Sequence, residues 1–163
     1  MSDRSPDPDK PKRLYFKTYM QMVRNSVGTE LFRNFYVETK ARGEFDSMSG
    51  GELSCAFYVS GLLRMFEKVA RVHGTVASTV KDMENSGWQV VDGPKSGDVL
   101  VWEKAEIEGD LVDHVGFYVG KGRAISNSYK TRTPIEHDMN FADSQPRKII
   151  KILRMEDWQD GRS

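Results

Sequence analysis

The sequence has a single cysteine, Cys55, and only three histidines, which are scattered along the chain. One cysteine cannot close an intrachain disulfide, so no disulfide framework is expected. His73, His114 and His137 also lack the spacing with each other and with Cys55 that a zinc site needs. We therefore expect the protein to work without a metal or any other cofactor.

An excess of either charge is also missing, because Lys and Arg together number 24 and Asp and Glu also number 24. Such a balance gives no reason to expect a nucleic acid or an anionic membrane as partner. The chain has no apolar run of about 18 residues and no apolar stretch of signal-peptide type near its start. The sequence thus predicts a protein with no membrane partner and a cytoplasmic location, with export by another route left open.

The distribution of prolines suggests where the folded part begins. Three of the six prolines lie within residues 1–12, among Ser, Asp and Lys and without an apolar cluster. This composition is typical of disorder, so residues 1–12 are predicted to be a leader. Residues 13–158 are long enough to bury one core and are predicted to form a single domain, followed by a tail at 159–163. The oligomeric state leaves no trace in the sequence.

Apolar spacing predicts three helices, over residues 14–27, 55–70 and 76–85. Residues 29–38 are ambiguous between a strand and irregular structure, and residues 43–51 are predicted to be a loop because they are rich in Gly, Ser and Asp. Ser54 directly precedes the second helix and is placed to cap it.

After Gly87 the pattern changes to short, β-rich segments separated by turn residues. Helices followed by strands predict an α+β fold in which amino-terminal helices pack on an antiparallel sheet. The expected strands cover residues 88–91, 99–103, 115–119, 123–128, 133–137 and 148–154.

Cys55 and His114 are the candidate catalytic pair. A lone cysteine is more often a buried structural residue, but Cys55 follows a Gly-Gly loop and begins a helix. The positive end of a helix favours the thiolate, so we expect a lowered thiol pKa, and first-turn N–H groups are suited to bind an oxyanion. His114 begins an apolar strand and is the imidazole available as a general base.

A third residue is needed to orient the imidazole, and strand register decides which it is. If Gly120-Lys121-Gly122 forms a three-residue loop, Ser126 shares a face of the sheet with His114. If the turn has only two residues, the register shifts by one and Asn127 faces His114 instead. His137, on the following strand, is a third candidate. In each case we expect the bond to be made to Nδ1 of the imidazole.

Three segments together resemble a known family. They are Ser-Cys-Ala at 54–56, Ser-Gly-Asp-Val-Leu-Val-Trp at 96–102 and Asp-His-Val-Gly-Phe-Tyr-Val-Gly at 113–120. In this order they resemble the NlpC-type branch of papain-like cysteine peptidases and, more distantly, amidase-type relatives that cut cell walls. The resemblance runs from about Gly50 to Ser128. It implies a papain-like fold and hydrolysis of an amide or isopeptide bond, typically in peptidoglycan peptides, through a thioester on Cys55.

The chain departs from that family at three positions. Family members usually have Asp before the nucleophile and a small polar residue after it, where this chain has Ser54 and Ala56. The third catalytic position, commonly His, is Ser126. The expected function is a cysteine hydrolase acting on a peptide or a peptidoglycan fragment. The alternative is a catalytically inactive papain-like domain that binds a peptide or protein partner. The basic pair Arg147-Lys148 is interpreted as solvated surface.

Overall fold

The computed structural model describes residues 7–158 and 161–162, which form three α-helices and three antiparallel sheets. The α+β prediction is confirmed. The helices are α1 (Tyr15–Asn25), α2 (Cys55–Met65) and α3 (Val76–Asn85), and a short 3₁₀ turn, η1 (Ser49–Gly51), precedes α2. The largest sheet has six strands in the order β4-β9-β5-β6-β7-β8. Their bounds are β4 (Gln89–Val90), β5 (Val99–Ile107), β6 (Asp110–Gly120), β7 (Arg123–Ser128), β8 (Thr133–Asp138) and β9 (Ile149–Arg154).

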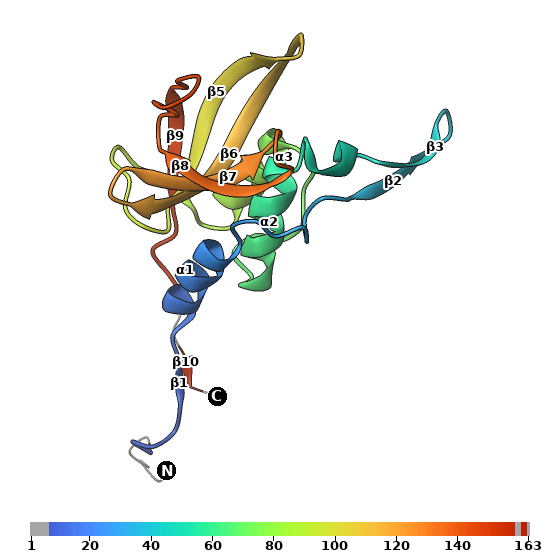
Figure 1. Ribbon diagram of the computed structural model, residues 1–163. Helices are drawn as coiled ribbons and strands as arrows, with labels where there is room; N and C mark the ends of the chain where they lie inside the picture. The colour runs from blue at the N-terminus through green and yellow to red at the C-terminus, as the bar shows by residue number, and fades with distance from the viewer. Residues whose placement is uncertain (1–6, 159–160, 163) are drawn as a thin grey trace.

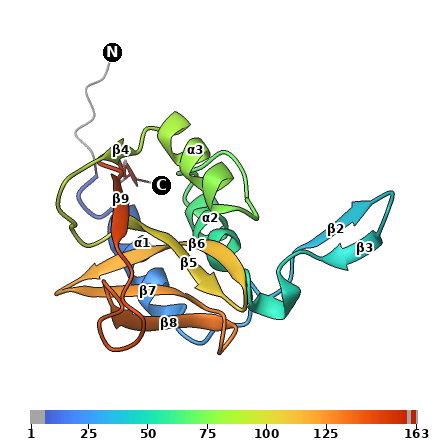
Figure 2. The same cartoon turned by 90° about the horizontal axis from the view of Figure 1, so that it is seen from above.

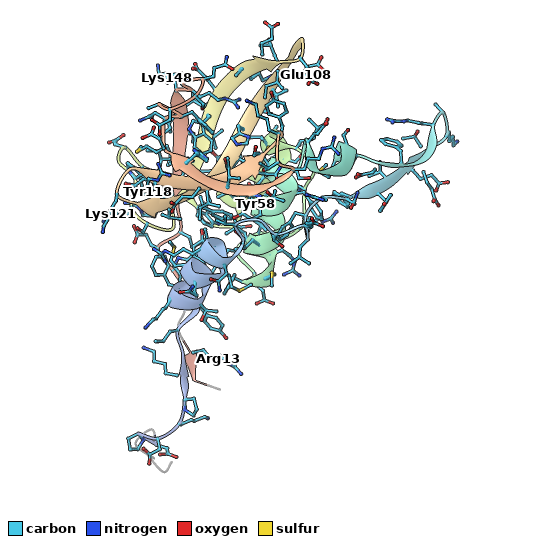
Figure 3. All side chains as sticks on the ribbon, viewed as in Figure 1. Arg13, Tyr58, Glu108, Tyr118, Lys121 and Lys148 are labelled. Carbon is cyan, nitrogen blue, oxygen red and sulfur yellow. The ribbon has the colours of Figure 1, made fainter. Side chains whose placement is uncertain are left out.

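The six-stranded sheet separates two apolar clusters. In Figure 1, α1 and α2 lie beneath the sheet, and α2 packs on β6 and β7. Tyr19, Tyr58 and Phe117 meet edge to face in the cluster between helices and sheet, where Figure 3 shows Tyr58 in the interior. The opposite face carries a smaller cluster that includes Trp102 and Tyr118. Side chains alternate across a strand, so neighbouring residues of β6 serve different clusters.

A hairpin formed by β2 (Tyr36–Thr39) and β3 (Gly43–Asp46) projects from the body as an arm (Figures 1 and 2). The prediction of a loop across residues 43–51 is therefore wrong for its first four residues. Asp46 fixes the base of the arm, because its carboxylate accepts the N–H groups of Phe35, Met48 and Gly50 at 2.8–3.0 Å. The arm is thereby tied to the turn that leads into α2.

The second helix ends earlier than its apolar pattern predicts, at Met65 rather than residue 70. Glu67 adopts a left-handed conformation with φ 56°. The Lys68 N–H bonds to the Leu63 carbonyl, and the Glu67 N–H bonds to the Arg64 carbonyl. This is a Schellman ending built without glycine, so no glycine marks the end of the helix in the sequence.

The two ends of the described chain pair with each other, β1 (Lys12–Arg13) against β10 (Gly161–Arg162). The predicted boundary between leader and domain at residue 12 falls inside β1. Residues 1–6, 159–160 and 163, which belong to the predicted leader and tail, lie outside the described residues. No helix in the described ranges is both long and apolar enough to cross a bilayer.

Candidate active site

Cys55 is the first residue of α2 and is 9% exposed. The preceding Gly50 and Gly51 have φ 67° and 103°, conformations that favour glycine. A Cβ on Gly51 would lie 2.9 Å from the Arg132 carbonyl oxygen, so the loop runs close against the β7–β8 turn. Asn127 adds a further tie, because its Nδ2 donates to the Gly51 carbonyl at 2.7 Å. The loop that precedes Cys55 is therefore held by β7 and by the β7–β8 turn.

Ser54 does not cap α2, contrary to the sequence prediction. Its φ and ψ of −85° and 7° keep its hydroxyl away from the first-turn N–H groups. The side chain is fully buried, and its Oγ has no hydrogen-bond partner within the part of the chain that the structure describes. A buried hydroxyl without a partner is destabilising, so this residue leaves an unmet polar group directly beside Cys55.

The Cys55 thiol has a raised pKa, not the lowered one expected from the helix terminus alone. Burial raises it to about 11, although the N–H groups of Val115 and Ala56 and the charge of Arg147 act in the opposite direction. Asp113 adds to the rise. Desolvation disfavours the thiolate more strongly than the helix end favours it. The resting thiol is therefore protonated at neutral pH.

The sulfur lies against β6 just beyond the last backbone pair that this strand makes with β7. Pairing between the two strands ends at Phe117 and Ile125, so the Val115 N–H is directed to the Cys55 sulfur instead of to β7. His114 is the next residue along β6. Between these two described side chains there is no hydrogen bond. Cys55 belongs to the cluster on the helix side of the sheet, whereas the His114 ring packs against Trp102 on the opposite face, so the structure brings the thiol to the neighbouring residue of β6 but not to the imidazole.

A chain of hydrogen bonds extends from His114 across three strands. Its Nε2 lies 2.8 Å from Ser126 Oγ, and the same Oγ lies 2.7 Å from His137 Nε2. His137 Nδ1 lies 2.7 Å from the Asp138 carbonyl oxygen. Ser126 thus meets His114 as the register argument predicted, but through Nε2 rather than the expected Nδ1.

The direction of this chain follows from the Asp138 carbonyl, which can only accept. His137 Nδ1 must therefore carry a proton, and because burial lowers the pKa of His137, its ring is neutral and Nε2 is an acceptor. Ser126 then donates its only proton to His137 and accepts from the Nε2–H of His114. Burial, Arg147 and His137 lower the pKa of His114 to about 3, so its ring is neutral too. His114 Nδ1 is left with a free lone pair.

Ser126 shares a face with His114 although the turn between β6 and β7 is not the three-residue loop on which that prediction depended. Gly120 pairs with Arg123, so the turn is the two-residue Lys121-Gly122, with φ values of 52° and 72°. A bulge between Tyr118 and Gly120 then shifts the register back by one. Ser126 therefore lies on the face of His114, while Asn127 points to the helix side. The prediction that Asn127 faces His114 with a two-residue turn is wrong.

Aromatic rings surround the relay. Trp102 is fully buried, its ring centre 5.3 Å from that of His114, and its Nε1 donates to the Met139 carbonyl at 2.8 Å. Phe141, on the β8–β9 connection, stacks on His137 with centroids 4.1 Å apart. These rings desolvate both imidazoles, which is the main cause of their lowered pKa values.

Arg147 is a site residue that the sequence did not indicate, and its interpretation as solvated surface is wrong. It is half-buried, with Nε and Nη2 bonded to the Glu103 carbonyl at 3.2 and 2.9 Å and Nη2 also bonded to the Val112 carbonyl at 2.5 Å. Its charge acts on both Cys55 and His114. The local sequence around Arg147 looks like that of a surface residue. Its position near Cys55 and His114 depends on the path of the irregular β8–β9 connection, which local sequence patterns do not predict.

The chain matches no protein-family model. No curated protein matches its sequence either. The interpretation of the site therefore depends on its geometry. Within residues 7–158 and 161–162, no group of three or more His, Cys, Asp and Glu side chains is arranged to hold a metal ion.

Proposed function

We propose that the protein is a papain-like cysteine hydrolase that cleaves an amide bond, with Cys55 as nucleophile and His114 as general base. The substrate class implied by the family resemblance is a peptide or isopeptide, with peptidoglycan peptides as the typical case. The α+β layering, with a helix-borne cysteine preceding a strand-borne histidine, supports the papain-like assignment.

The observation that carries the proposal is the direction of the His114–Ser126–His137 relay. A histidine in a structural core satisfies both ring nitrogens, whereas here the relay consumes the Nε2–H and leaves Nδ1 as an acceptor. A general base needs such a lone pair, held in a fixed orientation. The N–H of Val115, the residue after His114, is directed at the Cys55 sulfur, which supports the pairing of this thiol with this base.

The chemistry then begins from a neutral pair. His114 Nδ1 removes the thiol proton as the sulfur attacks the carbonyl carbon, and first-turn N–H groups of α2 bind the oxyanion. The Nδ1–H of His114 next protonates the departing amine, which leaves a thioester on Cys55. Water attacks the thioester, His114 accepts its proton, and the Cys55 thiol is released with the acid.

A peptidyl acyloxymethyl ketone tests this assignment, because it alkylates a cysteine that a neighbouring base activates. We expect mass spectrometry to locate the adduct on Cys55, and His114→Ala to slow labelling at least about a hundredfold. His73→Asn is the matched control, since His73 contacts Asp82 far from the relay and Asn can still donate to that carboxylate. Labelling of the wild type no faster than that of the urea-unfolded chain would contradict the proposal.

The second candidate is a catalytically silent domain that binds a peptide or protein partner. It is favoured by the raised pKa of the Cys55 thiol and by the lack of a thiol–imidazole hydrogen bond. Cys55→Ala distinguishes the two functions. A catalytic cysteine predicts lost turnover with a nearly unchanged Tm, whereas a structural cysteine predicts a Tm several degrees lower and no reaction of the wild type with the ketone.

A further inference from the structure

The guanidinium of Arg147 is held rigidly but is not neutralised by a bound carboxylate. Its bonds to the Glu103 and Val112 carbonyls use the N–H groups of Nε and Nη2. The backbone N–H of Arg147 also donates to the Asn140 carbonyl at 3.0 Å, which fixes the chain that carries it. Across residues 7–158 and 161–162, no acidic side chain lies within 4.0 Å of this guanidinium, and Nη1 has no hydrogen-bond acceptor.

This cation lies beside the reactive pair. Val112, which anchors it, is two residues before His114 on β6, and the Arg147 charge acts on both His114 and Cys55. The acidic groups that act on it are Asp113 and Glu103, at longer range than an ion pair. A half-buried guanidinium with an unused nitrogen therefore lies close enough to Cys55 for its charge to act on the thiol.

We propose that Arg147 binds a carboxylate of the substrate, so that the preferred substrates carry a free carboxylate close to the scissile amide. This inference rests on the proposed hydrolase function and narrows its substrate class. Partial burial makes an anionic ligand favourable, because the cation has lost part of its hydration. Its three anchoring bonds mean that little side-chain entropy is lost on binding. With only Nη1 unused, the group suits one carboxylate oxygen better than the several oxygens of a phosphate.

Two alkylating agents of nearly equal size test the proposal directly. Iodoacetate carries a carboxylate next to its reactive carbon, and iodoacetamide carries a neutral amide there. We measure the rate of Cys55 alkylation by each at pH 9 and take the ratio, which cancels changes in thiol pKa and in access. We expect the iodoacetate-to-iodoacetamide ratio of the wild type to exceed that of N-acetylcysteine by about fivefold or more.

Arg147→Gln is expected to return the ratio to that of N-acetylcysteine. Lys148→Gln removes the same charge from the next residue, which is exposed, and is expected to leave the ratio at the wild-type value. Asp113→Asn removes an internal competitor for the guanidinium and is expected to raise the ratio. A wild-type ratio equal to that of N-acetylcysteine overturns the proposal, even if Arg147→Gln does not fold.

Failure of the hydrolase function has a different signature, namely no alkylation of Cys55 by either reagent. The carboxylate site is then decided by titrating the protein with N-acetylglycine and, separately, with N-acetylglycinamide. The Arg147 Nε–H resonance reports on binding in both titrations. A shift with the acid alone supports the site, and the absence of any shift overturns it.

Discussion

The protonation of Cys55 is determined at the scale of single residues, by a balance of opposing effects. Burial raises the thiol pKa to about 11, while the Val115 N–H, the Ala56 N–H and the Arg147 charge lower it and Asp113 raises it. The position of Cys55 at a helix amino terminus led to the expectation of a thiolate. The helix terminus carries only about half a positive charge, however, which limits how far it can lower the thiol pKa. The loss of water around the sulfur outweighs it.

This balance predicts how alkylation of Cys55 by iodoacetamide depends on pH. In the wild type the rate should still be rising above the value of about 8.5 that is usual for a free cysteine, with a midpoint near 11. Arg147→Gln should move the midpoint up, because a cation near the thiolate is lost, and Asp113→Asn should move it down. A midpoint below 8.5 would show that the helix end dominates after all.

The relay makes a second prediction at this scale, on the tautomer of His114. Imidazole ¹⁵N chemical shifts at neutral pH should place the proton on Nε2, since Ser126 accepts there. Ser126→Ala should produce a mixture of tautomers, because neither nitrogen then has a defined partner. His137→Ala should do the same more weakly, since Ser126 is freed to donate toward His114. Wild-type His114 protonated on Nδ1 would rule out its role as base.

At the scale of elements, Gly116 allows β6 and β7 to bring His114 and Ser126 together. A Cβ at this position would lie 2.6 Å from Ser126 Cβ and 2.8 Å from the Ile125 carbonyl oxygen. The second contact is with a backbone atom, which cannot shift without disturbing β7. A side chain at position 116 would therefore destabilise the fold through a steric clash and not through an unfavourable backbone conformation.

We therefore expect Gly116→Ala to lower the free energy of unfolding by roughly 1–3 kcal/mol and to slow labelling of Cys55 by the peptidyl ketone. Urea denaturation and the labelling assay measure the two effects. Gly93→Ala is the matched control, because a Cβ at Gly93 has no heavy atom within 4 Å. Equal stabilities of the two variants would mean that the strands shift apart to accommodate the methyl group.

Element positions were largely predictable from sequence, whereas register and connections were not. The segment 123–128 was predicted with its observed bounds because turn residues flank it on both sides. No turn residue marks the bulge near Val119 in the sequence. This bulge determines that Ser126, and not Asn127, lies on the same face of the sheet as His114. His137 and Arg147 depend on how β8 and the β8–β9 connection fold back, which local patterns do not encode. Cys55, His114, Ser126 and His137 were thus all candidates from the sequence, whereas the order of the hydrogen bonds that join the last three, and the position of Arg147, were not predicted.

At the scale of the whole molecule, buried titratable groups define the pH range of stability. His114 has a pKa near 3 when folded and about 6.5 when unfolded, so the unfolded chain binds more protons between these values and stability falls as pH drops through them. Asp82 has a folded pKa near 2 because four hydrogen bonds outweigh its burial, which adds a loss below about pH 4. Cys55 acts at the other end, since its raised pKa favours the folded state until pH exceeds about 8.5.

Urea denaturation from pH 3 to pH 10 should therefore give a maximum of stability between about 6.5 and 8.5. Cys55→Ala should flatten the alkaline limb, and His114→Gln should flatten the decline between 6.5 and about 3, each by up to about 1.4 kcal/mol per pH unit. Stability that is constant from pH 5 to pH 10 would mean that neither group is buried in solution.

The covered thiol of Cys55 also affects how the protein withstands oxidants. Peroxides attack the thiolate, and a pKa near 11 leaves a thiolate fraction at neutral pH more than about a hundred times smaller than that of free cysteine. The sulfur is thereby shielded from conversion to sulfenic and sulfinic acid while no carbonyl is presented to it. In the proposed mechanism, a reactive anion forms only when His114 removes the thiol proton. The protonated, buried state of Cys55 should therefore make the protein resistant to oxidation by peroxides.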